Sequence, residues 1–117
     1  MSMLKDANVL VLGLGASGLA MAQWCARGGA QVRVWDSRLQ TPQSPPQAEV
    51  LRVSVPGAVL LAGALEASAL DGIQRLFKSP GLAPHDERIA PLLRAAAERG
   101  IAVEGELDLF AQALAAL

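Results

Sequence analysis

A glycine-rich hexapeptide carries the clearest chemical signal in this chain. Residues 13–18 read Gly-Leu-Gly-Ala-Ser-Gly, which matches the pattern G-x-G-x-x-G. The first glycine of this pattern permits a tight turn, the second lets the backbone approach a pyrophosphate, and the third lets the next helix pack closely on a sheet. Free N–H groups and the dipole at the start of that helix stabilise a diphosphate without any lysine. We therefore expect phosphate groups to bind at Gly13, Gly15, Ala16, Ser17 and Gly18.

Four side chains near the motif could add contacts to a nucleotide. The Ser17 hydroxyl either bonds a phosphate oxygen or caps the helix. Asp36 follows Gly18 by 18 residues, close to the offset of about 20 residues at which an acidic side chain reaches a nucleoside. The alternative for Asp36 is a turn residue at a strand end. Ser37 and Arg38 come next, and the Arg38 guanidinium either meets a phosphate or base, or is simply solvated.

Buried parallel strands are the elements expected to position these residues. Residues 8–12 form a continuous apolar run, which is typical of a strand covered on both faces, and the run ends at the glycine motif. Helical spacing over residues 16–27 predicts a helix that stops at Gly28 and Gly29, as left-handed caps do. Residues 31–35 are the predicted second strand, so Asp36 stands at its carboxyl end.

The rest of the chain repeats the order strand, crossing, strand. We expect further strands at 59–61, 75–78 and 101–103, and helices at 49–55, 65–70, 89–99 and 107–117. The proline-containing stretch 37–47 is predicted to be an exposed, mobile loop. Together these elements predict an α/β fold, a Rossmann-like doubly wound sheet of about five parallel strands with flanking helices.

The carboxyl ends of parallel strands meet at one crevice, where ligands bind. Ser79, Pro80 and Gly81 follow one strand and are either a wall of that site or an ordinary turn. The acidic residues at 104, 106 and 108 follow another strand, but without a histidine they favour surface charge over a metal site. Cys25 is expected in the core, and His85 in solvent. No residues form a catalytic constellation.

Composition narrows the possible functions further. The 117 residues carry a formal net charge of −1 and only 3% aromatic residues, which argues against a nucleic-acid groove. No run approaches the roughly 20 apolar residues that cross a bilayer. The amino end lacks the features of a secretion signal. We therefore expect a single domain over residues 1–117, in the cytoplasm, with neither nucleic acid nor membrane as a partner.

The chain resembles the amino-terminal domain of the Mur ligase family, in the branch that adds D-glutamate. The resemblance covers nearly the whole chain and rests on NVLVLGLGASG at 8–18, WDSR at 35–38, KSPGL at 78–82 and GIAVEGELDLF at 100–110. It implies that the domain holds the UDP part of UDP-N-acetylmuramoyl-L-alanine. The implied roles are diphosphate contacts from Gly15, Ala16, Ser17 and Gly18, a uridine site lined by Asp36, Ser37 and Arg38, and closure of the pocket by Ser79, Pro80 and Gly81.

The family's reaction uses ATP to activate the L-alanine carboxylate, and the amine of D-glutamate attacks the resulting acyl phosphate. A G-x-x-x-x-G-K-[ST] loop for ATP is absent from this chain. ATP, magnesium and D-glutamate are therefore expected to bind the ATPase and C-terminal domains of a longer enzyme, and this fragment to bind substrate without catalysis and without a cofactor. Two alternatives stay open: an NAD(P)-binding domain of a dehydrogenase or regulatory sensor, and a domain used only for association.

Overall fold

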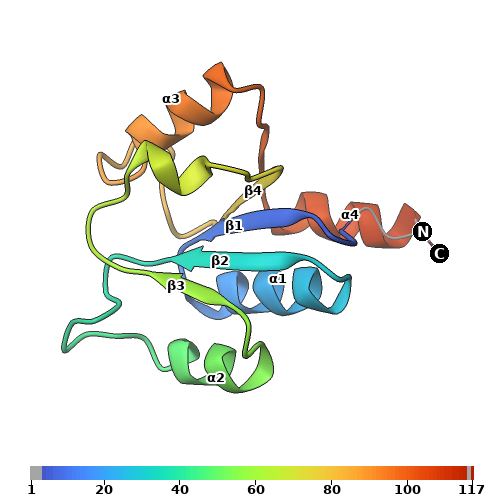
Figure 1. Cartoon of the computed structure of the whole chain (residues 1–117), viewed down its shortest axis with the longest axis horizontal. Coiled ribbons are helices and arrows are strands. Elements are labelled where there is room, and N and C mark those ends of the chain that lie inside the picture. The colour runs from blue at the N-terminus through green and yellow to red at the C-terminus, as the bar shows by residue number, and fades with distance from the viewer. Residues whose placement is uncertain (1–3, 116) are drawn as a thin grey trace.

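The computed structural model describes residues 4–115 and 117 and contains a five-stranded sheet in which every pairing is parallel, with the strand order β3-β2-β1-β4-β5 (Figure 1). The elements in chain order are β1 (Asn8–Leu12), α1 (Ala16–Arg27), β2 (Gln31–Trp35), α2 (Gln47–Ser54), β3 (Val59–Leu61), the 3-10 helix η1 (Ala67–Leu70), β4 (Arg75–Lys78), α3 (Ala90–Glu98), β5 (Val103–Glu104) and α4 (Glu106–Ala115). The predicted α/β fold is confirmed, and the first four strands have the predicted bounds.

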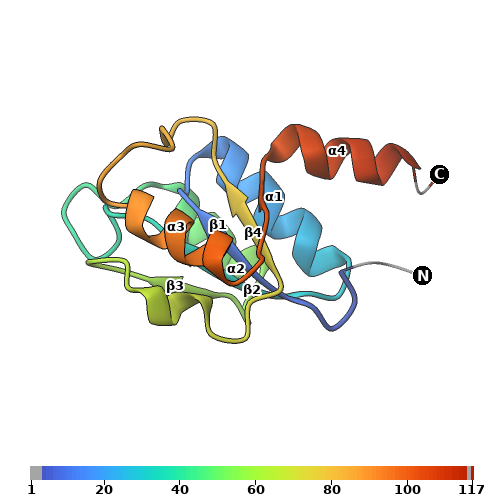
Figure 2. The same cartoon turned by 90° about the horizontal axis from the view of Figure 1, so that it is seen from above.

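Helices cover both faces of the sheet, as Figures 1 and 2 show. Because side chains alternate along a strand, Val9 and Val11 of β1 face the layer of α1, α2 and α4, whereas Leu10 and Leu12 face η1 and α3. All four of these β1 side chains are fully buried. The continuous apolar run at 8–12 therefore reflects a central strand with a core on each side.

The fifth strand begins two residues later than predicted. Residues 101–103 were expected, but pairing with β4 starts at Val103, which lies opposite Leu76. The cause is the end of α3, since the Ile101 amide donates to the Ala96 carbonyl at 2.8 Å and completes the last turn of the helix. At the end of α1, only Gly29 has a left-handed backbone (φ 96°), whereas Gly28 is right-handed (φ −78°).

The segment after β2 is less exposed than its prolines predict. Leu39 is buried and packs into the same core as Leu51 of α2, and Pro45 is buried as well. The prediction of an exposed loop is therefore wrong at these two positions, because they anchor the connection to α2. That helix starts at Gln47, two residues earlier than expected.

The acidic residues near β5 have structural partners. Glu104 forms an ion pair with Arg75 at 2.7 Å, and only 17% of its side chain is exposed, so the prediction of surface charge is wrong there. Asp108 accepts a hydrogen bond from the Gly105 amide at 2.7 Å, near the start of α4. Across residues 4–115 and 117, no group of three or more His, Cys, Asp or Glu side chains is arranged to hold a metal ion. The same residues contain no helix with the length and apolar character of a membrane span.

Candidate functional site

A cavity of about 460 Å³ opens at the carboxyl ends of β1, β2 and β4. Its walls are residues 13–17, 35–38 and 79–82, together with Arg88. Every predicted site residue except Gly18 lines this cavity. The expected convergence of the strand ends on one crevice is thus confirmed, and residues 79–81 form a wall of it rather than a turn elsewhere.

Two of the three motif glycines are required by the backbone geometry of the loop. Gly13 has φ 93°, and its amide donates to the Trp35 carbonyl at 2.7 Å. A Cβ atom on Gly18 would lie 1.8 Å from the Gly13 carbonyl oxygen, so only glycine lets α1 pack this closely on the loop. These observations confirm the roles predicted for the first and third glycines.

Gly15, the second glycine of the motif, borders open space in the cavity. A Cβ atom on Gly15 would meet no heavy atom within 4 Å. Gly15 is the N-cap of α1 and makes no side-chain cap, and the amides of Ala16, Ser17 and Gly18 donate to no partner within the described residues. The first turn of a helix leaves such N–H groups without intrahelical acceptors. The loop therefore offers unpaired donors and the positive end of a helix dipole to an anion.

Ser17 does not cap the helix. It lies inside the first turn of α1, beyond the N-cap Gly15, so its hydroxyl is not placed to cap. Its Oγ is buried and has no hydrogen-bond partner. A buried hydroxyl without a partner is costly, and a ligand oxygen in the cavity would supply one. The phosphate contact predicted for Ser17 stays a prediction.

Asp36 holds the glycine loop in place, a role that the sequence did not indicate. Its side chain is 7% exposed, and both carboxylate oxygens accept hydrogen bonds. Oδ2 accepts from the Leu14 amide at 2.8 Å, and Oδ1 accepts from the Arg38 amide at 2.8 Å. The Arg38 guanidinium adds two further bonds of 2.9 Å, one to each oxygen. Asp36 thereby ties the loop after β1 to the end of β2, and Arg38 is paired rather than simply solvated.

These contacts also determine the acidity of Asp36. Burial raises the pKa of its carboxyl group, but hydrogen bonds from the Arg38 side chain and from the Leu14 and Arg38 amides, with the charge of Arg38, outweigh burial and lower the pKa from 3.8 to about 2. A lowered pKa means that the ionised carboxylate stabilises the folded state.

We expect the Asp36 carboxylate to make stability depend on pH in the acid range. Because the folded pKa lies below 3.8, its stabilisation is present above about pH 4 and is lost as the pH falls to about 2. Asp36→Asn should lower the free energy of unfolding by about 1–3 kcal/mol at neutral pH, since an amide cannot satisfy all four donors. Urea unfolding between pH 7 and pH 2 measures both effects, and the variant should show the smaller acid-dependent loss. If the free energy of unfolding fell equally with pH in the unmodified chain and in Asp36→Asn, this role of Asp36 would be contradicted.

The third wall of the cavity is fixed by hydrogen bonds to backbone carbonyls. Ser79 is buried, and its Oγ donates to the Gly13 carbonyl at 3.0 Å, which joins this wall to the glycine loop. Lys78 Nζ donates to the carbonyls of Ser79 and Leu82 at 3.2 and 2.6 Å. Residues 79–82 therefore have a defined position beside the loop.

Arg88 is a cavity residue that sequence reasoning missed. It precedes α3, and its Nη1 donates to the Ser37 hydroxyl at 3.0 Å, although the two residues are 51 positions apart. Neither its spacing nor its neighbours place it near the motif, so no signal in the sequence indicates this contact. His85, close by in sequence, is exposed as expected, and Cys25 is fully buried in the core.

The parallel strand order β3-β2-β1-β4-β5, with the glycine loop at the carboxyl end of the central strand β1, defines a Rossmann-like domain. The sequence model of one family, described as Mur ligase MurD-like, N-terminal domain, matches residues 7–105. The chain belongs to this family, and the resemblance inferred from its motifs is confirmed.

Relatives that are about 50% identical over the aligned region support the same assignment. The UDP-N-acetylmuramoylalanine--D-glutamate ligase of Albidiferax ferrireducens is 50% identical over 119 residues, which cover all of this chain and 22% of the relative. The enzyme of the same name from Burkholderia mallei is 51% identical, over 93% of this chain and 21% of its own length. The chain thus spans about a fifth of the length of these relatives.

Solved structures show how widely the fold is shared. UDP-N-acetylmuramate:L-alanyl-gamma-D-glutamyl-meso-diaminopimelate ligase from Neisseria meningitides matches 86% of this chain and 29% of its own, with a TM-score of 0.62 and 16% identity. Shikimate dehydrogenase from Aquifex aeolicus matches 89% of this chain and 44% of its own, with a TM-score of 0.57 and 19% identity. At such identities these likenesses establish the Rossmann-like fold alone.

Proposed function

We propose that this chain is the domain of a D-glutamate-adding Mur ligase that binds the UDP group of UDP-N-acetylmuramoyl-L-alanine. One observation carries the proposal: the amides of Ala16, Ser17 and Gly18 are unpaired at the start of α1, beside an open cavity. Such a helix start binds a diphosphate through its N–H groups and its dipole. The substrate class comes from the D-glutamate ligases that are about 50% identical to this chain over the aligned region.

The walls of the cavity fit a nucleoside next to that diphosphate. We assign the diphosphate to the space beside Gly15 and the amides of residues 16–18, with Gly13 shaping the turn, because the Gly13 amide already donates to the Trp35 carbonyl. The uridine is assigned to the space between residues 36–38 and 79–81. The cavity there has a mixed lining, with apolar Trp35 and Leu82 beside the polar groups of Ser37 and Arg38. Pockets for small ligands combine apolar walls with a few placed polar groups in this way.

The geometry of Asp36 favours this function over NAD(P) binding. In dinucleotide sites an acidic side chain at the end of the second strand accepts hydrogen bonds from the ribose hydroxyls. Here both oxygens of Asp36 are already occupied by four donors of the protein itself. A ribose hydroxyl would have to displace Arg38 or the Leu14 amide to reach the Asp36 oxygens. The Asp36 carboxylate is therefore not available to bind a ribose.

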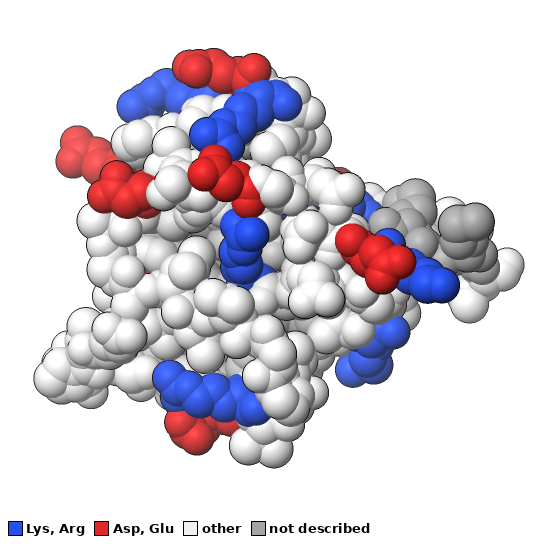
Figure 3. All heavy atoms as spheres, viewed as in Figure 1, with Lys and Arg blue, Asp and Glu red and all other residues white. Residues whose placement is uncertain are grey.

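The complete reaction belongs to a longer enzyme in this proposal. ATP, magnesium and D-glutamate would bind outside these 117 residues, and the ligation would take place in the cytoplasm. The face seen in Figure 3 does not suit a nucleic-acid partner, because positive side chains stand beside negative ones there and do not gather into a basic patch.

Calorimetric titration of the 117-residue chain tests this function. We expect measurable binding of UDP-N-acetylmuramoyl-L-alanine and of UDP, and at least about tenfold weaker binding of NADH and NADPH, because Asp36 is not free to hold their ribose. Tighter binding of either nicotinamide cofactor than of the UDP ligands would reject the proposal. Absence of binding by every ligand would favour a domain used only for association.

A further inference from the structure

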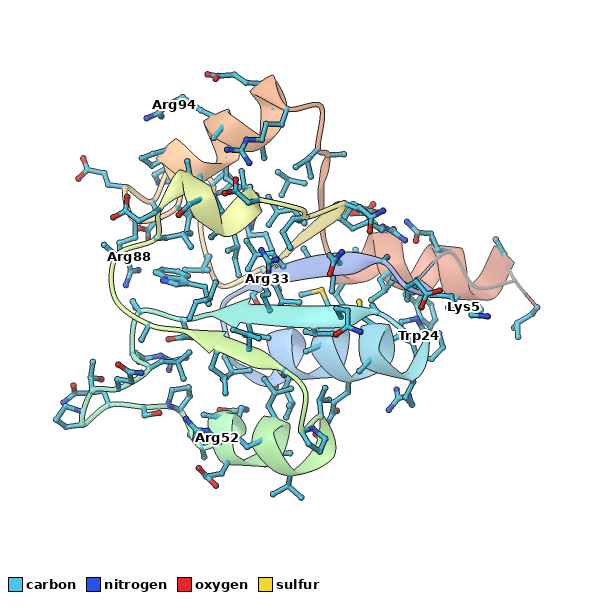
Figure 4. All side chains as sticks on the ribbon, viewed as in Figure 1. Lys5, Trp24, Arg33, Arg52, Arg88 and Arg94 are labelled. Carbon is cyan, nitrogen blue, oxygen red and sulfur yellow. The ribbon has the colours of Figure 1, made fainter. Side chains whose placement is uncertain are left out.

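Arg88 lies near the end of the connection between β4 and α3, the segment whose first four residues, 79–82, also line the cavity. Figure 4 shows Arg88 between the segment that precedes α3 and the carboxyl end of β2, whereas Arg94 points away from the sheet on the outer side of α3. The two arginines therefore belong to the same part of the fold, but only one of them lines the cavity.

The guanidinium of Arg88 is held in a defined orientation. Asp86 Oδ1 accepts from Nε at 3.0 Å and from the Arg88 amide at 2.9 Å, and Oδ2 accepts from Nη2 at 2.7 Å. The remaining terminal nitrogen, Nη1, donates to the Ser37 hydroxyl. A side chain oriented by a paired carboxylate gives up little conformational freedom when it binds a ligand.

Unused donors remain on this guanidinium. Arginine has five N–H groups, and the hydrogen bonds to Asp86 and Ser37 use three of them, which leaves two without a partner in the described part of the chain. The side chain is 55% exposed, so these donors are open to a ligand. The neighbouring wall, residues 79–82, contributes no charged side chain to the cavity.

We propose that Arg88 is a nucleotide-binding residue whose free N–H groups donate to the oxygen atoms of the nucleoside, at the end of the cavity beside Ser37. This inference rests on the proposed UDP function and extends it. A uracil base and its ribose present carbonyl and hydroxyl oxygens, which suit a group that only donates hydrogen bonds. The diphosphate lies at the start of α1 in this arrangement, so Arg88 and the glycine loop hold different parts of the ligand.

Titration of UDP into Arg88→Ala and Arg94→Ala tests the assignment. We expect Arg88→Ala to weaken UDP binding about tenfold, because charge-assisted hydrogen bonds are lost. Arg94→Ala, an exposed position on α3 outside the cavity, should bind as the unmodified chain does. Both variants should keep the melting temperature of the parent protein. In a crystal structure with UDP, an Arg88 nitrogen should lie within about 3.2 Å of a base or ribose oxygen.

The possible failures are distinguishable. If the unmodified chain does not bind UDP, the proposed function is rejected, and this inference with it. If the unmodified chain and Arg88→Ala bind UDP equally, or if bound UDP leaves Arg88 in contact with Asp86 and Ser37 alone, the role of Arg88 is rejected and the function stands.

Discussion

Replacing Gly15 with valine is expected to abolish binding of UDP ligands while the fold remains. The backbone at this position, with φ −99° and ψ −159°, is extended and accessible to any residue. A Cβ atom there meets no protein atom within 4 Å, so the branched side chain would project into the open space above the unpaired amides. Because that space is the proposed diphosphate site, affinity should fall by at least about 100-fold, or about 2.7 kcal/mol.

The cost to stability should be small by comparison. Valine is a poorer N-cap than glycine, which predicts a loss of about 1 kcal/mol in the free energy of unfolding. Gly57→Val is the matched control, since a Cβ at this exposed turn also meets nothing within 4 Å and the position lies outside the cavity. Titration with UDP and urea unfolding separate the two effects. Wild-type affinity in Gly15→Val would place the diphosphate elsewhere.

The substitution Gly18→Ala is expected to disrupt the loop itself. Its Cβ atom would lie 1.8 Å from the Gly13 carbonyl oxygen and 2.9 Å from the Gly13 carbonyl carbon, and both are backbone atoms that cannot rotate away. The start of α1 would have to move off the sheet, at a cost of about 3 kcal/mol or more. Because the unpaired amides would move with the helix, UDP binding should be lost as well.

Thermal and urea unfolding measure this effect against a neutral replacement. Gly57→Ala adds the same methyl group in open space and should change the free energy of unfolding by no more than about 0.5 kcal/mol. A Gly18→Ala protein as stable as Gly57→Ala would show that the loop tolerates a side chain, and that the close approach of α1 to Gly13 is not required. Together with Gly15→Val, this variant separates a glycine needed by the ligand from a glycine needed by the fold.

Local features of the sequence determined most of the fold. The apolar run at 8–12, the second strand and the glycine motif each depend on neighbouring residues, because burial on both faces selects apolar side chains and tight turns select glycine. The roles of Gly13 and Gly18 follow from the motif for the same reason. The convergence of residues 13–18, 36–38 and 79–81 was also predictable, since parallel strands place their carboxyl ends at one edge.

Only the tertiary structure decided how those segments contact one another. The bond from the Leu14 amide to Asp36 spans 22 positions, and the bond from Arg88 to Ser37 spans 51. The burial of Leu39 and the late start of β5 likewise depend on where α2 and α3 pack. A short pattern of residues fixes local backbone shape and which side of an element is buried. A hydrogen-bond partner depends on the relative position of whole elements, which is established only when the layers pack together.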